Sequence, residues 1–109
     1  MLDEADRDVL KTLTVLYVED DAETVTQARR YLQPRVGSLL TAEDGGEALQ
    51  LFEQHRPDIV ATDIRIPGPD GLEITENIRE RSPSTPVILI TAFESTDYLR
   101  RAVNAGVEQ

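Results

Sequence analysis

The feature that most constrains the fold of this chain is a fourfold alternation of short apolar runs and helix-like segments. The apolar runs, too short for helices and typical of buried strands, lie at residues 13–18, 38–42, 58–63 and 87–91. Apolar residues at three- and four-residue spacing predict helices at residues 22–33, 47–55, 72–81 and from Ser95 or Thr96 to about 104. Apolar strands that alternate with helices indicate a parallel sheet with helices on both faces. We therefore predict an α/β protein with a doubly wound parallel sheet.

The chain is predicted to form one domain. Its 109 residues suit a single domain, and no repeat, low-complexity tract or linker divides them. We place the domain at residues 12–109 and interpret residues 1–11 as a lead-in that is short and helical or frayed.

Composition argues against several classes of function. The 11 Lys and Arg stand against 21 Asp and Glu, and the net charge of −10 disfavours nucleic acid or an anionic membrane as a direct partner. The absence of cysteine and the single histidine leave little for thiolate or imidazole chemistry. No apolar run approaches the roughly 20 residues of a membrane span, and the acidic N-terminus does not resemble a signal peptide. The expected location is the cytoplasm, and any chemistry must use carboxylates, hydroxyls and backbone groups.

Acidic residues gather where the predicted strands end. Glu19, Asp20 and Asp21 follow the first strand, Glu43 follows the second, and Asp63 ends the third. Right-handed crossovers place the carboxyl ends of parallel strands at one rim, where open α/β sheets bind ligands. With the first and third strands as neighbours, we expect Glu19, Asp20 and Asp63 to converge within a few ångströms.

Three carboxylates so close together repel one another unless a bound cation offsets their negative charge. Oxygen ligands alone select a hard cation, and a few carboxylates with waters suit Mg²⁺ better than Ca²⁺. Bound Mg²⁺ makes an acidic pocket attractive to phosphate, and a central carboxylate can then attack phosphorus to form an acyl phosphate. Thr91, at the end of the fourth strand, offers a hydroxyl at the same rim. The chemistry indicated is Mg²⁺-assisted phosphorylation of an aspartate.

Four motifs in order carry a resemblance to a known family. They are VLYVEDD at 15–21, PDIVATDIRIP at 57–67, DGLE at 70–73 and PVILITA at 86–92, with AVNAG at 102–106 as a further match. Each motif is weak alone, but together they are specific. From about Leu13 onward the chain resembles a chemotaxis-type response-regulator receiver domain. The resemblance implies a flavodoxin-like fold with strand order 2-1-3-4 and a role in two-component signalling.

The resemblance also implies residue roles. Asp63 would be the phosphoacceptor, and Thr91, with Ala92, would bind the phosphoryl group as the switch. The Mg²⁺ ligands would be Asp20 and Asp63 directly, Glu19 through water, and the backbone carbonyl of Arg65. The implied partner is a sensor histidine kinase or phosphotransfer protein that donates the phosphoryl group from a histidine.

The sequence departs from the family pattern near its C-terminal end. Receiver domains continue with a fifth strand, a lysine that ends it and a fifth helix, whereas Gln109 falls where that strand is expected to begin. The single lysine, Lys11, precedes the first strand, so no catalytic lysine is assigned. We expect a receiver fold truncated after the fourth β-α unit. The apolar edge at residues 87–91 would then be open to self-association.

Two other functions are weighed against this one. An aspartate-nucleophile phosphatase of the haloacid-dehalogenase kind would place an Asp-x-Asp pair after the first strand, whereas Asp63 lies on the third and has no second Asp two residues later. A pseudo-receiver that binds partners without phosphotransfer is the stronger alternative, because the lysine is absent. Asp21 and residues 44–46 and 70–71 are interpreted as helix starts and turns.

Overall fold

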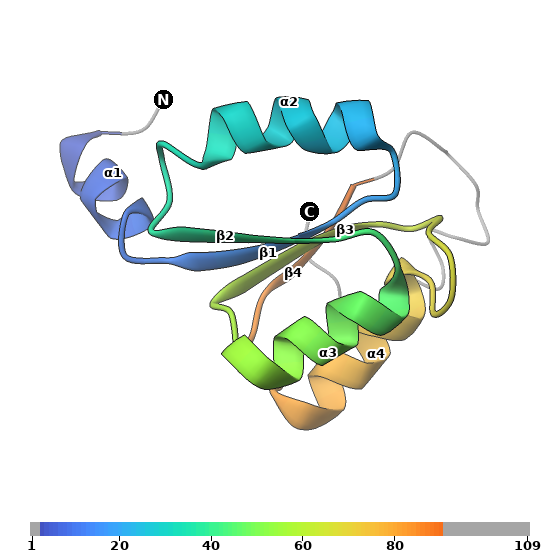
Figure 1. Ribbon diagram of the computed structural model, residues 1–109. Helices are drawn as coiled ribbons and strands as arrows, with labels where there is room; N and C mark the ends of the chain where they lie inside the picture. The colour runs from blue at the N-terminus through green and yellow to red at the C-terminus, as the bar shows by residue number, and fades with distance from the viewer. Residues whose placement is uncertain (1–2, 91–109) are drawn as a thin grey trace.

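A computed structural model describes residues 3–90 of the chain (Figure 1). Its elements in chain order are α1 (Glu4–Leu10), β1 (Thr14–Val18), α2 (Ala22–Leu32), β2 (Ser38–Ala42), α3 (Gly45–His55), β3 (Ile59–Asp63), α4 (Gly71–Arg81) and β4 (Val87–Ile90). None of the helices in this part of the chain is long and apolar enough to cross a membrane.

The four strands form one parallel sheet in the order β2-β1-β3-β4, which confirms the predicted class and strand order. The central strand β1 pairs on both sides, since Val18 lies opposite Ala42 of β2 and Thr62 of β3. Helix α2 covers one face of the sheet, and α3 and α4 cover the other (Figure 1). The chain therefore switches faces between β1 and β3, and a ligand site is expected at the carboxyl ends of these two strands.

The face under α3 and α4 holds the main core. Its side chains come from three strands and both helices, and each is less than 2% exposed: Leu16, Val18, Val60, Val87, Phe52, Ile74 and Ile78. Burying each such side chain contributes about 1.5–3 kcal/mol. A smaller cluster of Ile64, Leu72 and Leu89 lies beside it. This face fixes the sheet against α3 and α4 and so positions the loops above it.

The α2 face is covered less completely. No residue of α2 is buried, although Val25, Ala28 and Leu32 are half-buried at helical spacing. On the outer strand β4, Ile88 and Ile90 alternate with buried residues and are 38% and 47% exposed. These two side chains belong to the strand for which the sequence predicts an open edge.

Helix boundaries follow the capping residues. Helix α3 begins two residues before the predicted start, because the Asp44 carboxylate accepts a hydrogen bond from the Glu47 N–H at 2.7 Å and so caps the helix at Gly45. The lead-in holds helix α1, capped by Asp3. The other elements lie within a residue of their predicted bounds, except the helix expected up to about residue 104, which falls outside the described residues.

Candidate functional site

The ends of β1 and β3 lie side by side at the rim of the sheet. Val18 pairs with Thr62 in the parallel register. The next positions on the two strands are Glu19 and Asp63, and residues at matching positions of neighbouring strands point to the same face. The Glu19 N–H donates to the Ala42 carbonyl at 3.0 Å, which carries the pairing of β1 one residue further. The structure thus makes neighbours of two residues predicted to share a site.

The Glu19 carboxyl is held in an unfavourable place for a negative charge. The residue is 8% exposed, and its Oε2 atom is buried without a hydrogen-bond partner in the described part of the chain. Burial raises the pKa of Glu19 to about 7, and hydrogen bonding with Asp63, the charge of Asp63 and then the charge of Asp20 add to the shift. Burial, with the charges of Glu19 and Asp63, also raises the pKa of Tyr17. A backbone hydrogen bond with Asp20 favours the charged form of Glu19, but burial and the neighbouring acids outweigh it.

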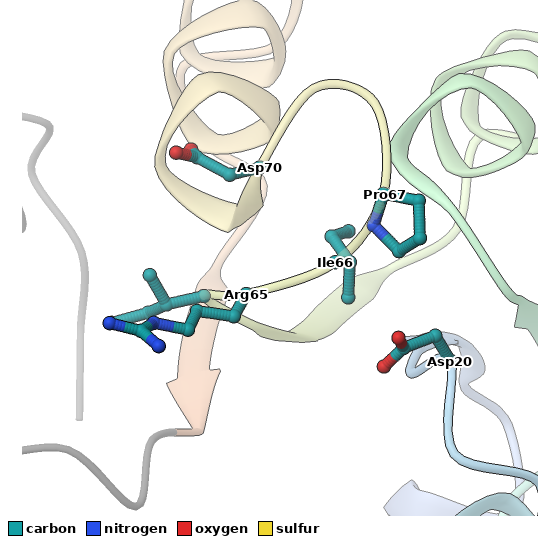
Figure 2. Close-up of a pocket in the computed structure, with 6 residues that line it drawn as sticks. Asp20, Arg65, Ile66, Pro67 and Asp70 are labelled. Carbon is teal, nitrogen blue, oxygen red and sulfur yellow. The ribbon is translucent and has the colours of Figure 1, made fainter.

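Asp20 faces a pocket of about 390 Å³ beside the Glu19–Asp63 pair. Figure 2 shows its carboxylate on one side of the pocket and the β3–α4 loop on the other. The loop contributes the rest of the lining: Ile64, Arg65, Ile66, Pro67 and Asp70. The structure thus brings Asp20 and Arg65, two of the predicted ligands, to one pocket.

Two nearby acids cap helices: Asp21, interpreted from the sequence as an acid of the first helical turn, lies one residue before α2, and Asp70 lies one residue before α4. Asp21 accepts hydrogen bonds from both the N–H and the hydroxyl of Thr24, and these bonds hold the pKa of Asp21 below its usual range. Asp70 accepts from the N–H groups of Leu72 and Glu73, each at 2.9 Å, at the start of α4. Both carboxylates are engaged in starting helices.

A second pocket of about 180 Å³ is lined by Glu19 and Asp20 together with residues of α2 and the end of β2. Its lining includes Glu43, which the sequence places at the rim, and Arg29, which the sequence does not single out. Arg29 Nη2 donates to the Thr41 hydroxyl at 3.1 Å. Helical spacing alone cannot show this contact, because it depends on how α2 lies across β2.

The residues present fit a hard divalent cation. Among residues 3–90 no three His, Cys, Asp or Glu side chains form a ready-made metal cluster. Mg²⁺, however, is usually held by one or two carboxylates and keeps several waters, so two of the three acids Glu19, Asp20 and Asp63 could hold it. The raised pKa of Glu19 and its unpartnered Oε2 indicate a charge for which a cation is a suitable counterion.

Two predicted site residues and the single lysine remain to be located. Thr91 and Ala92 fall outside the described residues. Lys11 follows α1 and precedes β1, so it lies at the opposite end of that strand from Glu19.

The fold and the rim define a doubly wound α/β domain with an acidic site where β1 and β3 end. The family model described as the response regulator receiver domain matches residues 15–109. The chain belongs to the receiver domains of two-component response regulators, which are generally signalling modules and not enzymes.

Curated relatives share about a third of their aligned residues with this chain. It is 33% identical over 96 residues to a cyclic di-GMP phosphodiesterase of Thermotoga maritima, and 34% identical over 94 residues to the response regulator MprA of a Mycobacterium species. The alignments cover 88% and 86% of this chain but 26% and 41% of those proteins. The chain therefore spans less than half the length of these relatives.

Solved structures show the same fold. The N-terminal domain of an uncharacterized Wolinella succinogenes protein matches with a TM-score of 0.84 at 34% identity, over 89% of this chain and 78% of that one. The chemotaxis protein CheY4 of Vibrio cholerae matches with a TM-score of 0.80 at 26% identity, over 88% and 82% of the two chains. These matches confirm the flavodoxin-like receiver fold.

Proposed function

We propose that this receiver domain accepts a phosphoryl group on Asp63 with the help of Mg²⁺. The observation that carries the proposal is the Glu19–Asp63 pair at the ends of adjacent parallel strands, where burial and the neighbouring acids disfavour a negative charge on Glu19. Glu19 is buried, whereas Asp63 is only half-buried, so Asp63 is the carboxyl that a donor can reach. The family match supports the same assignment.

The proposed reaction is a single phosphoryl transfer. An Asp63 oxygen attacks the phosphorus of a donor phosphohistidine. The new P–O bond forms as the P–N bond breaks, and the released histidine keeps the electron pair and takes up a proton. When bound, Mg²⁺ supplies charge neutralisation at the phosphoryl oxygens.

The ligands we assign to Mg²⁺ are Asp63 and Asp20 directly, the Arg65 backbone carbonyl, and Glu19 through water. Asp20 and Arg65 line the pocket beside the Glu19–Asp63 pair, which supports this set. We assign Thr91 and Ala92 to phosphoryl binding on the family pattern.

The donor that we propose is a sensor histidine kinase or a histidine phosphotransfer protein in the cytoplasm, because MprA, one of the relatives, is named a response regulator. Phosphorylation would shift an equilibrium between two conformations in the region of β4 and so change the surface offered to partners.

A small phosphodonor tests the proposal directly. The protein is incubated with Mg²⁺ and acetyl phosphate or phosphoramidate, and its intact mass is measured. We expect the mass of one phosphoryl group to be gained, and the gain to be lost in Asp63→Asn and on chelation of Mg²⁺. Asp70→Asn serves as the matched control, because it changes a neighbouring carboxylate that caps α4. Absence of an adduct in the folded wild type with every donor would overturn the proposal.

The alternative is a pseudo-receiver that binds partners without phosphotransfer. A folded protein that binds Mg²⁺ but never gains a phosphoryl group would support this alternative. Repeated turnover of phosphate esters would instead indicate the phosphatase.

A further inference from the structure

The β3–α4 loop carries Arg65, and one backbone hydrogen bond closes its base. Its ends are joined by the Gly71 N–H, which donates to the Ile64 carbonyl at 2.9 Å. Its middle, residues 67–69, reads Pro-Gly-Pro, and the two prolines have no N–H to donate. The position of this middle turn must therefore be set by other elements.

Gly45, the first residue of α3, holds the middle of the loop. Its N–H donates to the Pro67 carbonyl at 2.9 Å. The first N–H groups of a helix have no partner within the helix, so the start of α3 can supply this bond. The α-carbon of Gly45 also lies against Pro69, and a Cβ there would lie 1.9 Å from the Pro69 carbonyl oxygen. Only glycine permits so close an approach.

The contact lies on the same loop as the proposed metal site. Ile66 and Pro67 line the pocket opposite Asp20, and Ile66 is also part of the main core. The loop is therefore held between the core on one side and the start of α3 on the other. A displacement of residues 67–69 would change the width of the pocket and the position of the Arg65 carbonyl.

We infer that Gly45 is a positioning residue for the site at Asp63: through its contacts with Pro67 and Pro69 it sets where the Arg65 carbonyl lies. The inference rests on the proposed function, because it concerns the loop that would complete the Mg²⁺ site. It adds the β2–α3 connection, which contributes no ligand, to the parts of the fold that determine metal affinity.

The chain provides a matched control at the next residue. Gly46 lies in the same helical turn and is exposed, and a Cβ there would meet only the Asp44 Oδ1 atom, at 3.3 Å. Gly46→Ala adds the same methyl group to α3 without touching the loop. A difference between Gly45→Ala and Gly46→Ala therefore reports the contact with the loop and not helix propensity.

Mg²⁺ titration of the purified 109-residue protein tests the inference. Tyrosine emission is a suitable signal, because the chain has no tryptophan and Tyr17 lies near Glu19 and Asp63. We expect Gly45→Ala to raise the Mg²⁺ dissociation constant about tenfold or more, as loss of an outer contact to a metal ligand commonly does. Gly46→Ala is expected to stay close to the wild type.

Phosphorylation gives a second readout. Loss of metal positioning predicts that Gly45→Ala phosphorylates slowly at low Mg²⁺ and recovers at saturating Mg²⁺. A general loss of structure would lower the rate at every Mg²⁺ concentration. A folded Gly45→Ala variant with wild-type Mg²⁺ affinity would overturn the inference.

If Gly45→Ala does not fold, a second pair of variants, at Gly68, tests the same effect of the loop on Mg²⁺ binding. Gly68 has a φ of 76°, and a Cβ there would meet nothing nearer than the Gly46 nitrogen, at 3.8 Å, so Gly68→Ala strains the same turn without a clash. We expect Gly68→Ala to weaken Mg²⁺ binding and Gly68→Asn, which tolerates positive φ, to restore it. Equal affinity in Gly68→Ala and the wild type would contradict the inference. A wild type without any Mg²⁺ response would instead contradict the proposed function.

Discussion

The pKa of Glu19, at the end of β1, depends on its burial and on the neighbouring acids Asp63 and Asp20. Its backbone continues the pairing of β1, which fixes the side chain beside Asp63. The position is buried, so the charged form loses hydration that no described hydrogen bond to Oε2 replaces. A negative charge on Glu19 therefore weakens the folded state.

The raised pKa of Glu19 makes the stability of the folded protein depend on pH. The folded protein holds the Glu19 proton up to about pH 7, whereas the unfolded chain releases it near 4.5. The stabilisation from this tighter proton binding is full below about pH 4.5 and is lost as the pH rises through about 7. We expect Glu19→Gln to flatten the fall in Tm over this interval, measured by thermal denaturation without divalent metal.

Exposed Glu76→Gln is the control for removing one negative charge, and it should keep the wild-type pH dependence. Mg²⁺ should stabilise the wild type more above the pKa of Glu19 than below it, because the cation and the proton compete for the same carboxyl. An unchanged slope in Glu19→Gln would contradict the assignment of this pKa.

Part of the candidate site is predictable from the sequence. The juxtaposition of Glu19 and Asp63 follows from two apolar runs that each end in an acid, and the register of β1 and β3 makes the two residues neighbours. The role of Gly45 is not predictable in this way: residues 44–46 have the composition of a turn, and nothing local to that turn indicates its contact with Pro69. Contacts between loops depend on loop conformation, which hydrophobic periodicity does not encode.

At the scale of elements, the two faces of the sheet contribute unequally to stability. Ile78 of α4 is fully buried, whereas Val25 of α2 is half-buried. We expect Ile78→Ala to lower the free energy of unfolding by about 2–5 kcal/mol. Val25→Ala should cost about 1 kcal/mol or less, because less apolar area is lost. Urea denaturation of both variants measures the difference, and equal losses would show that α2 is packed as tightly as α4.

Helix capping gives a prediction about Asp70. Asp70→Ala removes the acceptor for two N–H groups at the start of α4 and should cost about 1 kcal/mol of stability. Asp70→Asn keeps an oxygen acceptor and should be close to the wild type in unfolding experiments. Neither change should abolish Mg²⁺ binding, in contrast to Asp20→Asn. If Asp70→Asn lost Mg²⁺ affinity as Asp20→Asn does, Asp70 would be a ligand as well as a cap.

Element boundaries are predictable where a local signal exists. Pro34 indicates the end of α2 within one residue, since proline disfavours helix in the residue before it. Helical periodicity predicts that α3 starts at residue 47, two residues too late. Gly45 and Gly46 have no apolar side chain to extend the periodic pattern, although Asp44 caps the helix at Gly45. The hydrogen bond from the Glu47 N–H to the Asp44 carboxylate sets this boundary, and the sequence alone does not show that it forms.

At the scale of the whole molecule, exposed apolar residues on β4 give a prediction about association. Ile88 and Ile90 lie on the outer strand of the described sheet, on the face that α2 leaves partly open. We expect the 109-residue chain to self-associate reversibly, and Ile88→Thr with Ile90→Thr to weaken association, as measured by sedimentation velocity over a range of concentrations.

Val9→Thr is the control, because Val9 is 58% exposed on α1, away from the sheet. Added salt should strengthen association, since the net charge of −10 repels copies of the chain at low ionic strength. A chain that stays monomeric at all concentrations, or an equal effect of Val9→Thr, would contradict this prediction.

The pairing of Val18 with Thr62 determines how the site can be lost as well as how it forms. Inserting one residue into β1 would leave Glu19, Asp20 and Asp63 all present in the chain. It would nevertheless turn every side chain of the shifted strand to the opposite face, and Glu19 would meet the apolar core under α3. The candidate site thus depends on which face of the sheet each side chain of β1 occupies as much as on residue identities. A shift of this alternation by one residue would remove the site without any substitution.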